Sequence, residues 1–61
     1  MLEQFDIGDR VTLADGDGRP RVPGTIIETV TPLYQDQPQG LLVWIDGGAR
    51  RVTDATEARP L

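Results

Sequence analysis

Glycine and proline interrupt this sequence so often that long helices are disfavoured from one end to the other. Seven glycines and five prolines separate short apolar runs along the 61 residues. Proline lacks a backbone N–H and glycine weakens helices, so apolar runs of this length are typical of strands joined by turns. We therefore expect one all-β domain over residues 1–61, built as a small barrel or sandwich.

The apolar runs predict five strands. Polar and apolar residues alternate in the first, and six of the seven residues from Thr25 to Thr31 are β-branched, which favours a pleated strand. Asp-Gly-Gly at 46–48 is a strong tight-turn signal, because glycine accepts positive φ without steric cost. The expected strands cover residues 9–14, 25–31, 40–46, 49–53 and 58–61.

A single helical turn is expected just before the last strand. Asp54 can accept hydrogen bonds from the backbone at the start of this turn, and Glu57 stands three positions later. We therefore expect a short 3-10 turn over residues 54–57. Residues 1–8 are expected to form a loosely ordered N-terminus.

A chain this short can bury only a small core, so its stability needs support. The usual supports are disulfides, a structural metal or self-association. There is no cysteine, which excludes disulfides, and no histidine, which leaves a zinc site only carboxylates. We expect no metal and no cofactor, and self-association is the support that remains.

Five residue types are missing from the chain, namely Ser, Cys, His, Lys and Asn. A nucleophile–base pair would have to come from Thr, Tyr and carboxylates alone, which excludes most catalytic arrangements within one copy. The net charge of −4 disfavours binding to a phosphate backbone, because such binding needs clustered cations. We therefore expect no enzyme and no catalytic residue, and a nucleic-acid partner is disfavoured.

Four short motifs, spread over nearly the whole chain, carry a family resemblance. They are Gly-Asp-Arg-Val at 8–11, Pro-Gly-Thr-Ile at 23–26, Trp44 just before Asp-Gly at 46–47, and Val52. In this order they resemble the SH3-like barrels of bacterial proteins, including the KOW, Tudor and plasmid-type versions. The resemblance implies a five-stranded SH3-like barrel and says little about function.

The type II dihydrofolate reductases of plasmids belong to that class and work as tetramers around a shared pore. The Gly-Asp-Arg-Val motif that begins their first strand is similar to residues 8–11 here. Their pore is lined by a Val-Gln-Ile-Tyr run, whereas residues 49–53 read Ala-Arg-Arg-Val-Thr, and their substrate-holding lysine has no counterpart. The resemblance implies the architecture and oligomerisation without the activity, so a divergent reductase-like protein ranks as the last alternative.

The third expected strand is apolar on both faces. If Leu42 and Trp44 face the core, as the tryptophan does in the resembling barrels, then Leu41, Val43 and Ile45 lie on the other face. A strand that is apolar on both faces is covered on both faces. In a chain with no long helix the cover is expected to be another chain, with Val43 and Ile45 as contact residues.

Ile27 extends this predicted contact surface if Ile26 and Val30 face the core. The alternative is that the register differs by one residue. A slip of one residue exchanges the two faces of a strand, so Val43, Ile45 and Ile27 would then pack under a loop.

Trp44 and Tyr34 are the two large amphipathic aromatic residues. Aromatic side chains beside the first and second loops form the binding groove of SH3-like proteins. Trp44, in the middle of an apolar strand, is more typical of a core residue. Tyr34 lies in a polar loop and is the better surface candidate, although a lone tyrosine beside Leu33 also serves to pack a loop down.

Arg50 and Arg51 are neighbours on the fourth strand, so their side chains point to opposite faces. One interpretation is an edge charge that discourages sheet-to-sheet pairing. The other is an ion pair across an interface, or a contact with an acidic partner or a phosphate. Together with Arg10 they would serve a nucleic-acid-associated KOW- or Tudor-like accessory domain, which is the second hypothesis.

Asp-Gly-Asp-Gly at 15–18 is similar to the opening of a calcium loop. Arginine and proline follow where further oxygen ligands are needed, and Ile26 occupies the twelfth position, where an EF-hand has glutamate. We therefore expect an ordinary turn.

The leading hypothesis is a non-catalytic protein-interaction module that associates with itself through the outer face of the third strand. No apolar run approaches the ~20 residues of a membrane span, and the first residues are unlike a signal peptide. We expect a small, acidic, bacterial, cytoplasmic protein that forms a homo-oligomer and has no membrane contact.

Overall fold

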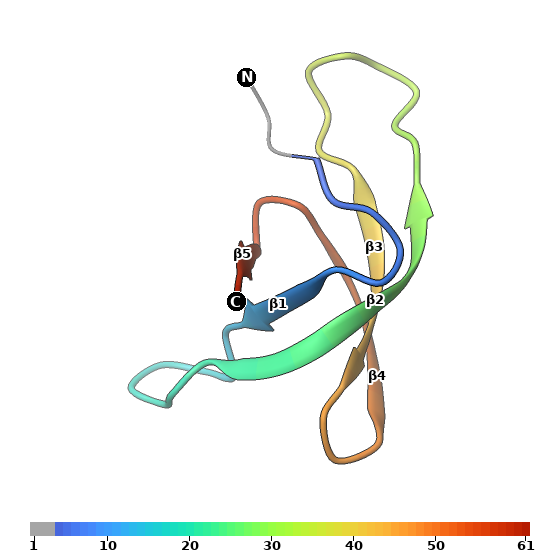
Figure 1. Cartoon of the computed structure of the whole chain (residues 1–61). Coiled ribbons are helices and arrows are strands. Elements are labelled where there is room, and N and C mark those ends of the chain that lie inside the picture. Colours follow the sequence, from blue (N-terminus) through green and yellow to red (C-terminus); the bar gives the residue numbers. More distant parts are fainter. Residues whose placement is uncertain (1–3) are drawn as a thin grey trace.

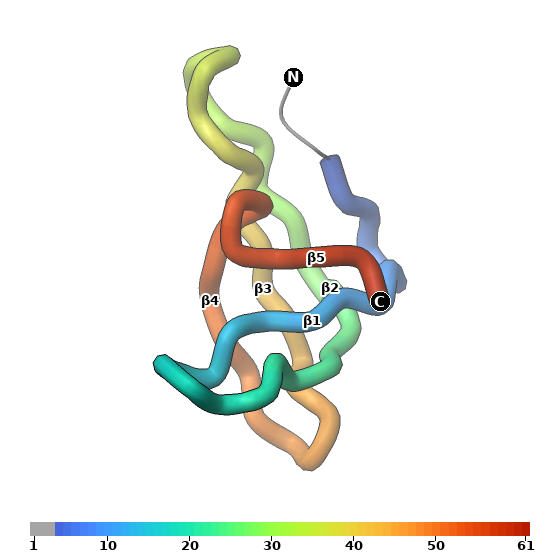
Figure 2. The backbone as a smooth tube through the Cα atoms, turned by 90° about the vertical axis from the view of Figure 1, so that its left-hand side faces the viewer, coloured from blue at the N-terminus to red at the C-terminus, as the bar shows by residue number. Residues whose placement is uncertain are grey.

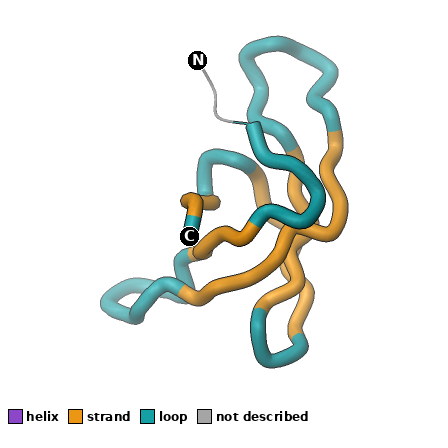
Figure 3. Tube along the Cα trace, viewed as in Figure 1, coloured by secondary structure: helices purple, strands orange, loops and turns teal. Residues whose placement is uncertain are grey.

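The structure is a computed structural model that describes residues 4–61. It contains five strands, with turns and loops between them and no helix in the described residues (Figures 1 and 3). The strands are β1 (Arg10–Leu13), β2 (Val22–Val30), β3 (Gly40–Ile45), β4 (Ala49–Asp54) and β5 (Ala58–Pro60). The all-β prediction is therefore confirmed.

The five strands form one antiparallel sheet in the order β4-β3-β2-β1-β5. β5 lies alongside β1, and β4 forms the opposite edge (Figure 2). The predicted closure into a barrel is wrong, because the sheet ends at β4 and β5. β5 has three residues that all pair with β1, so it does not reach the edge of β4.

The expected 3-10 turn is also not formed. Residues 55–57 make a simple turn in which the Glu57 N–H donates to the Asp54 carbonyl at 3.1 Å. The Asp54 carboxylate accepts from the Thr56 N–H at 2.9 Å and from the Thr56 hydroxyl. The carboxylate satisfies the turn locally, so no further helical hydrogen bond is needed.

β2 is the long strand of the sheet and pairs with β1 and with β3. It begins at Val22, earlier than the sequence indicated, and its register against β3 shifts between Ile26 and Glu28. A bulge of this kind bends a strand and increases its twist. Gly24 allows the close packing at the bend, since a Cβ there would lie 2.7 Å from the Trp44 carbonyl oxygen and from a Val43 methyl group.

The sheet is curved (Figure 1), and the core residues of β2 and β3 share one face, which we call the inner face. Leu41, Val43 and Ile45 of β3 are buried, while Leu42 is half-buried and Trp44 is 43% exposed. The expectation that Leu42 and Trp44 face the core was therefore wrong, and the alternative with the register shifted by one residue holds. The buried hydrophobic residues are Phe5, Val11, Leu13, Ile26, Leu41, Val43, Ile45, Ala55 and Ala58.

A physical reason explains which face of β3 turns inward. Leu41, Val43 and Ile45 place three aliphatic side chains inside, which bury more apolar surface than two residues would. A buried Trp44 would also need a partner for its indole N–H, and the buried set contains no polar side chain. The odd-numbered residues therefore fill the small core with aliphatic groups only.

The N-terminal segment closes one end of this core. Phe5 is buried, its N–H donates to Gln39 Oε1 at 2.8 Å, and its carbonyl accepts from Gln39 Nε2 at 2.8 Å. Residues 1–8 were expected to be loosely ordered. Of these, Met1–Glu3 lie outside the described residues. None of the elements in residues 4–61 is a helix with the length and hydropathy needed to cross a membrane.

Matched valine truncations test which face of the sheet is buried. Val43→Ala should lower the free energy of unfolding by about 2–3 kcal/mol, because it removes two methyl groups from a fully buried site. Val52→Ala removes the same atoms from a site in the neighbouring strand that is 84% exposed in the single chain, and should cost less than about 1 kcal/mol at protein concentrations low enough to keep the chain monomeric. Urea unfolding of both variants measures the difference, and equal costs would contradict the burial of Val43.

Candidate interaction surface

The outer face of the sheet carries four apolar residues on three neighbouring strands. They are Val30 of β2, Leu42 and Trp44 of β3, and Val52 of β4, and we call them the apolar patch. Val30 is 65% exposed and Val52 is 84% exposed. Leu42 lies directly opposite Val52, so these two side chains are cross-strand neighbours on the same face.

Polar residues flank Trp44 of the apolar patch along a row that crosses the sheet. Arg10, Thr25, Trp44 and Arg50 occupy matching register positions on four neighbouring strands. Arg10 donates to Asp46 through both terminal nitrogens, at 2.8 and 2.6 Å, and its Nη1 also donates to Thr25 Oγ1 at 2.9 Å. This bidentate pair fixes the guanidinium against the β3–β4 turn.

The Arg10–Asp46 pair shifts the ionisation of both groups. The hydrogen bond from Arg10, aided by the charge of Arg10, holds the pKa of the Asp46 carboxyl below its usual range, although partial desolvation opposes the shift. The same hydrogen bond raises the pKa of Arg10. The pKa of Asp54 is also lowered, first by the hydroxyl of Thr56 and then by the Thr56 N–H. Both aspartates are therefore charged at neutral pH.

Arg50 and Arg51 lie on opposite faces of β4. Arg50 is opposite Trp44 and is exposed on the outer face. Arg51 is opposite Val43 on the inner face, where Nη1 donates to the Ala14 carbonyl at 2.8 Å and Nη2 lies 3.5 Å from Asp15 Oδ1. Arg51 thus bridges the open side of the sheet to the loop after β1, while Arg50 has no such role.

The structure separates the residues that were predicted to make contacts. Val43 has no exposed surface and Ile45 is 9% exposed, so in this fold neither can present a side chain to a partner. Ile27 is the extra residue of the β2 bulge and is half-buried. The apolar patch was missed because its two residues on β3, Leu42 and Trp44, were expected to face the core.

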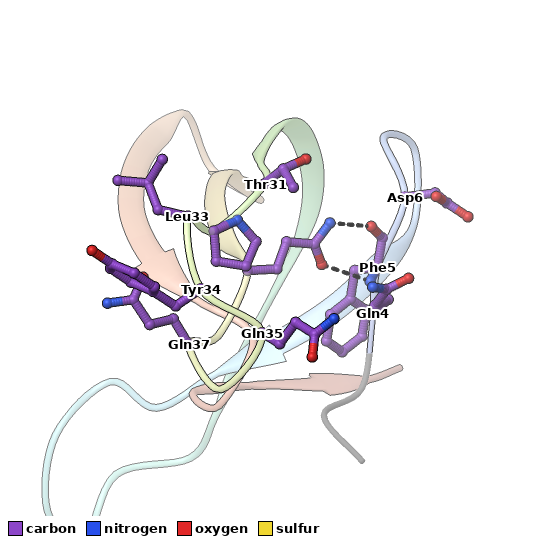
Figure 4. A pocket seen from close by; sticks show the side chains of 10 residues that line it. Gln4, Phe5, Asp6, Thr31, Leu33, Tyr34, Gln35 and Gln37 are labelled. Carbon is purple, nitrogen blue, oxygen red and sulfur yellow. Dashed lines mark hydrogen bonds between the residues drawn. The ribbon is translucent and has the colours of Figure 1, made fainter.

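Tyr34 is exposed in the loop of residues 31–39, which follows Val30 of the apolar patch. Beside this loop lies an open cleft of about 520 Å³, bounded on its other side by the segment that contains Phe5 (Figure 4). Figure 4 shows the Tyr34 ring beside Gln37. The Gln39 amide accepts from the Phe5 N–H and donates to the Phe5 carbonyl. The cleft is lined by Gln4, Phe5, Asp6, Thr31, Pro32, Leu33, Tyr34, Gln35, Gln37 and Gln39.

The Asp-Gly-Asp-Gly segment at 15–18 forms a turn, as expected. Gly16 and Gly18 have φ of 120° and 73°, and the Arg19 N–H donates to the Gly16 carbonyl at 3.3 Å. Residues 4–61 hold no group of three or more acidic, histidine or cysteine side chains that could bind a metal ion. Asp15 instead faces the guanidinium of Arg51.

Comparison of the chain with protein-family models, with characterised proteins and with solved structures finds no significant match.

The Arg10–Asp46 pair predicts a pH dependence of stability. Because the folded pKa of Asp46 is depressed, its contribution is complete above the ordinary aspartate pKa of about 3.9 and is lost as the pH falls through the lower folded value. Asp46→Asn should therefore be less stable than the wild type at pH 6, and the difference should shrink below about pH 4.

Thermal unfolding of the two proteins between pH 6 and pH 2.5 measures this difference. Asp36→Asn is the matched control, because it changes an exposed loop carboxylate for which the structure records no ion pair. A difference between wild type and Asp46→Asn that stays constant over this pH range would contradict the ion pair.

Proposed function

We propose that this chain is a non-catalytic protein-interaction module that associates with itself through the outer face of β3. The observation that carries the proposal is the apolar patch, in which Leu42, Trp44, Val52 and Val30 occupy one exposed face of three neighbouring strands. Scattered surface apolar residues are ordinary, but four on one face of three neighbouring strands, with the chain's one tryptophan among them, are typical of an interaction site.

The composition of this face also fits an interface. Tryptophan is enriched at the centre of interfaces, and arginine and other polar groups form the rim. Arg50 lies beside Trp44, and Glu28 lies opposite Leu42, so charged groups border the apolar residues. Full desolvation of Trp44 or Val52 would contribute about 1.5–3 kcal/mol each, before the cost of association is subtracted.

The proposal includes an SH3-like identity for the fold. Five antiparallel strands, a long polar loop after β1, a tight turn between β3 and β4 and a single turn before β5 support it. The sheet is open in this chain, which leaves β4 available at an edge. Self-association would supply the support that a 61-residue chain without disulfides needs.

The contacts of the arginines favour this proposal over a nucleic-acid accessory domain. Arg10 is held by Asp46, and Arg51 is held by Ala14 and Asp15. Two of the three guanidinium groups suggested for phosphate contact are thus engaged within the chain, and the net charge is −4. A reductase-like activity is supported by no feature of the described residues and ranks last.

Substitution of Trp44 tests the proposal. Trp44→Thr should raise the dissociation constant for self-association about tenfold or more, because it removes the largest apolar group of the patch. Sedimentation equilibrium measures the constant. Tyr34→Thr is the matched control, since it removes the other exposed aromatic residue, which is not part of the patch, and should leave association unchanged.

Lysine substitutions separate loss of association from loss of folding. Val52→Lys places a charge on the exposed face and should dissociate the assembly while the circular dichroism spectrum stays native. Val43→Lys places the charge in the core and should unfold the chain. A wild-type chain that sediments as a monomer at high micromolar concentration would overturn the proposed function.

A further inference from the structure

β4 is an exposed edge strand. It pairs with β3 on one side and with no other strand of the described chain on its other side (Figures 1 and 2). Unpaired backbone groups along such an edge are a template for another strand. The other edge, β5, has three residues and ends in Pro60, which has no N–H to donate. β4, with six residues and no proline, is the edge that can accept a strand.

The hydrogen bonds next to β4 indicate which residues face its open side. The Ala55 N–H, one position beyond β4, donates toward β3, to the Gln39 carbonyl at 2.8 Å. In an antiparallel ladder the backbone groups of successive residues point to alternate sides. The backbone N–H and C=O groups of Arg51 and Thr53 therefore point toward β3, like those of Ala55. The backbone groups that point to the open edge are those of Arg50, Val52 and Asp54.

We propose that a second copy of this chain pairs antiparallel with β4 at this edge, about a two-fold axis at Val52. In this register Val52 lies opposite Val52 of the second copy. Arg50 of each copy lies opposite Asp54 of the other, on the outer face. The proposal rests on the proposed function, because it adds a contact along the edge of β4 to the self-association through the outer face of β3.

Charge complementarity selects this register. A two-fold pairing that keeps the outer faces of both copies on the same side must place even-numbered residues of β4 opposite even-numbered residues, and odd-numbered opposite odd-numbered. An axis at Arg50 or Arg51 would put like charges opposite each other, which is destabilising. An axis at Thr53 would put Val52 opposite Asp54. The axis at Val52 alone combines an apolar pair with two pairs of opposite charge.

The same register extends the apolar patch. Leu42 is opposite Val52 within one copy, so the pairing creates a continuous row of Leu42, Val52, Val52 and Leu42 across the two copies. The side chain of Val52, 84% exposed in one copy, becomes covered by its counterpart. The second copy thereby buries apolar surface at the edge of the patch and joins the two patches on one face.

A single-cysteine variant tests the register directly, because the chain has no cysteine of its own. Directly opposite Cα atoms in a hydrogen-bonded antiparallel pair lie about 5.5 Å apart, which a disulfide can span. Val52→Cys should therefore form a covalent dimer on mild oxidation with diamide, as seen by non-reducing electrophoresis. Leu42→Cys is the matched control, since its two copies would lie three strand spacings, about 14 Å, apart.

A charge reversal tests the ion pairs. Arg50→Glu puts two acidic pairs in place of the two ion pairs and should raise the dissociation constant about tenfold at low salt. Arg19→Glu changes the net charge equally, at an exposed loop position, and should leave the constant unchanged. Sedimentation equilibrium measures both variants.

The outcomes separate this inference from the proposed function. Efficient cross-linking of Val52→Cys with weaker association of Arg50→Glu supports the edge register. Cross-linking at Leu42 in preference to Val52 would overturn the edge register and would leave self-association through the face intact. If Trp44→Thr weakens association while Val52→Cys does not cross-link, the edge register fails and the proposed function stands. If the edge variants respond while Trp44→Thr has no effect, the role of the β3 face fails.

Discussion

The inner face of β3 packs Leu41, Val43 and Ile45 into the small aliphatic core, and most other features of the molecule depend on that packing. β3 is paired on both sides, so its orientation fixes the orientation of its neighbours β2 and β4 as well. With the odd positions inside, Trp44 must lie outside together with its cross-strand neighbours. The exposed apolar patch is therefore a direct consequence of how the core is filled.

Charged side chains complete the fold where the backbone does not close it. Arg51 extends from the inner face of β4 to the loop after β1, and Arg10 fastens β1 to the β3–β4 turn. Arg21 adds a third tie, because it donates to the Thr12 carbonyl at 2.7 Å and to the Glu57 carbonyl at 2.9 Å. These three arginines hold the ends of an open sheet together, so their guanidinium groups are engaged within the chain.

The unpaired backbone groups of the β4 edge and the exposed side chains of the apolar patch lie next to each other on the sheet. The edge of β4 adjoins the patch through Val52, which belongs to both. Arg50 and Asp54 flank Val52 on the same face, at positions where opposite charges meet only in one two-fold alignment. The β4 edge and the apolar patch therefore form one continuous surface. Substitutions at Trp44 affect contacts of the patch, and substitutions at Arg50 affect pairing at the edge.

The sequence by itself determined the fold class, the number of strands and most of their positions, because glycine, proline and β-branched residues act locally on the backbone. It also limited the chemistry, since five reactive or polar residue types are missing. It did not determine which face of β3 turns inward, because the strand carries apolar residues on both faces and so has no polar face to mark the outside. Only the tertiary structure decided that point, through the bend of β2 at its bulge, the packing of Val43 against Gly24 and the shortness of β5, which leaves the sheet open.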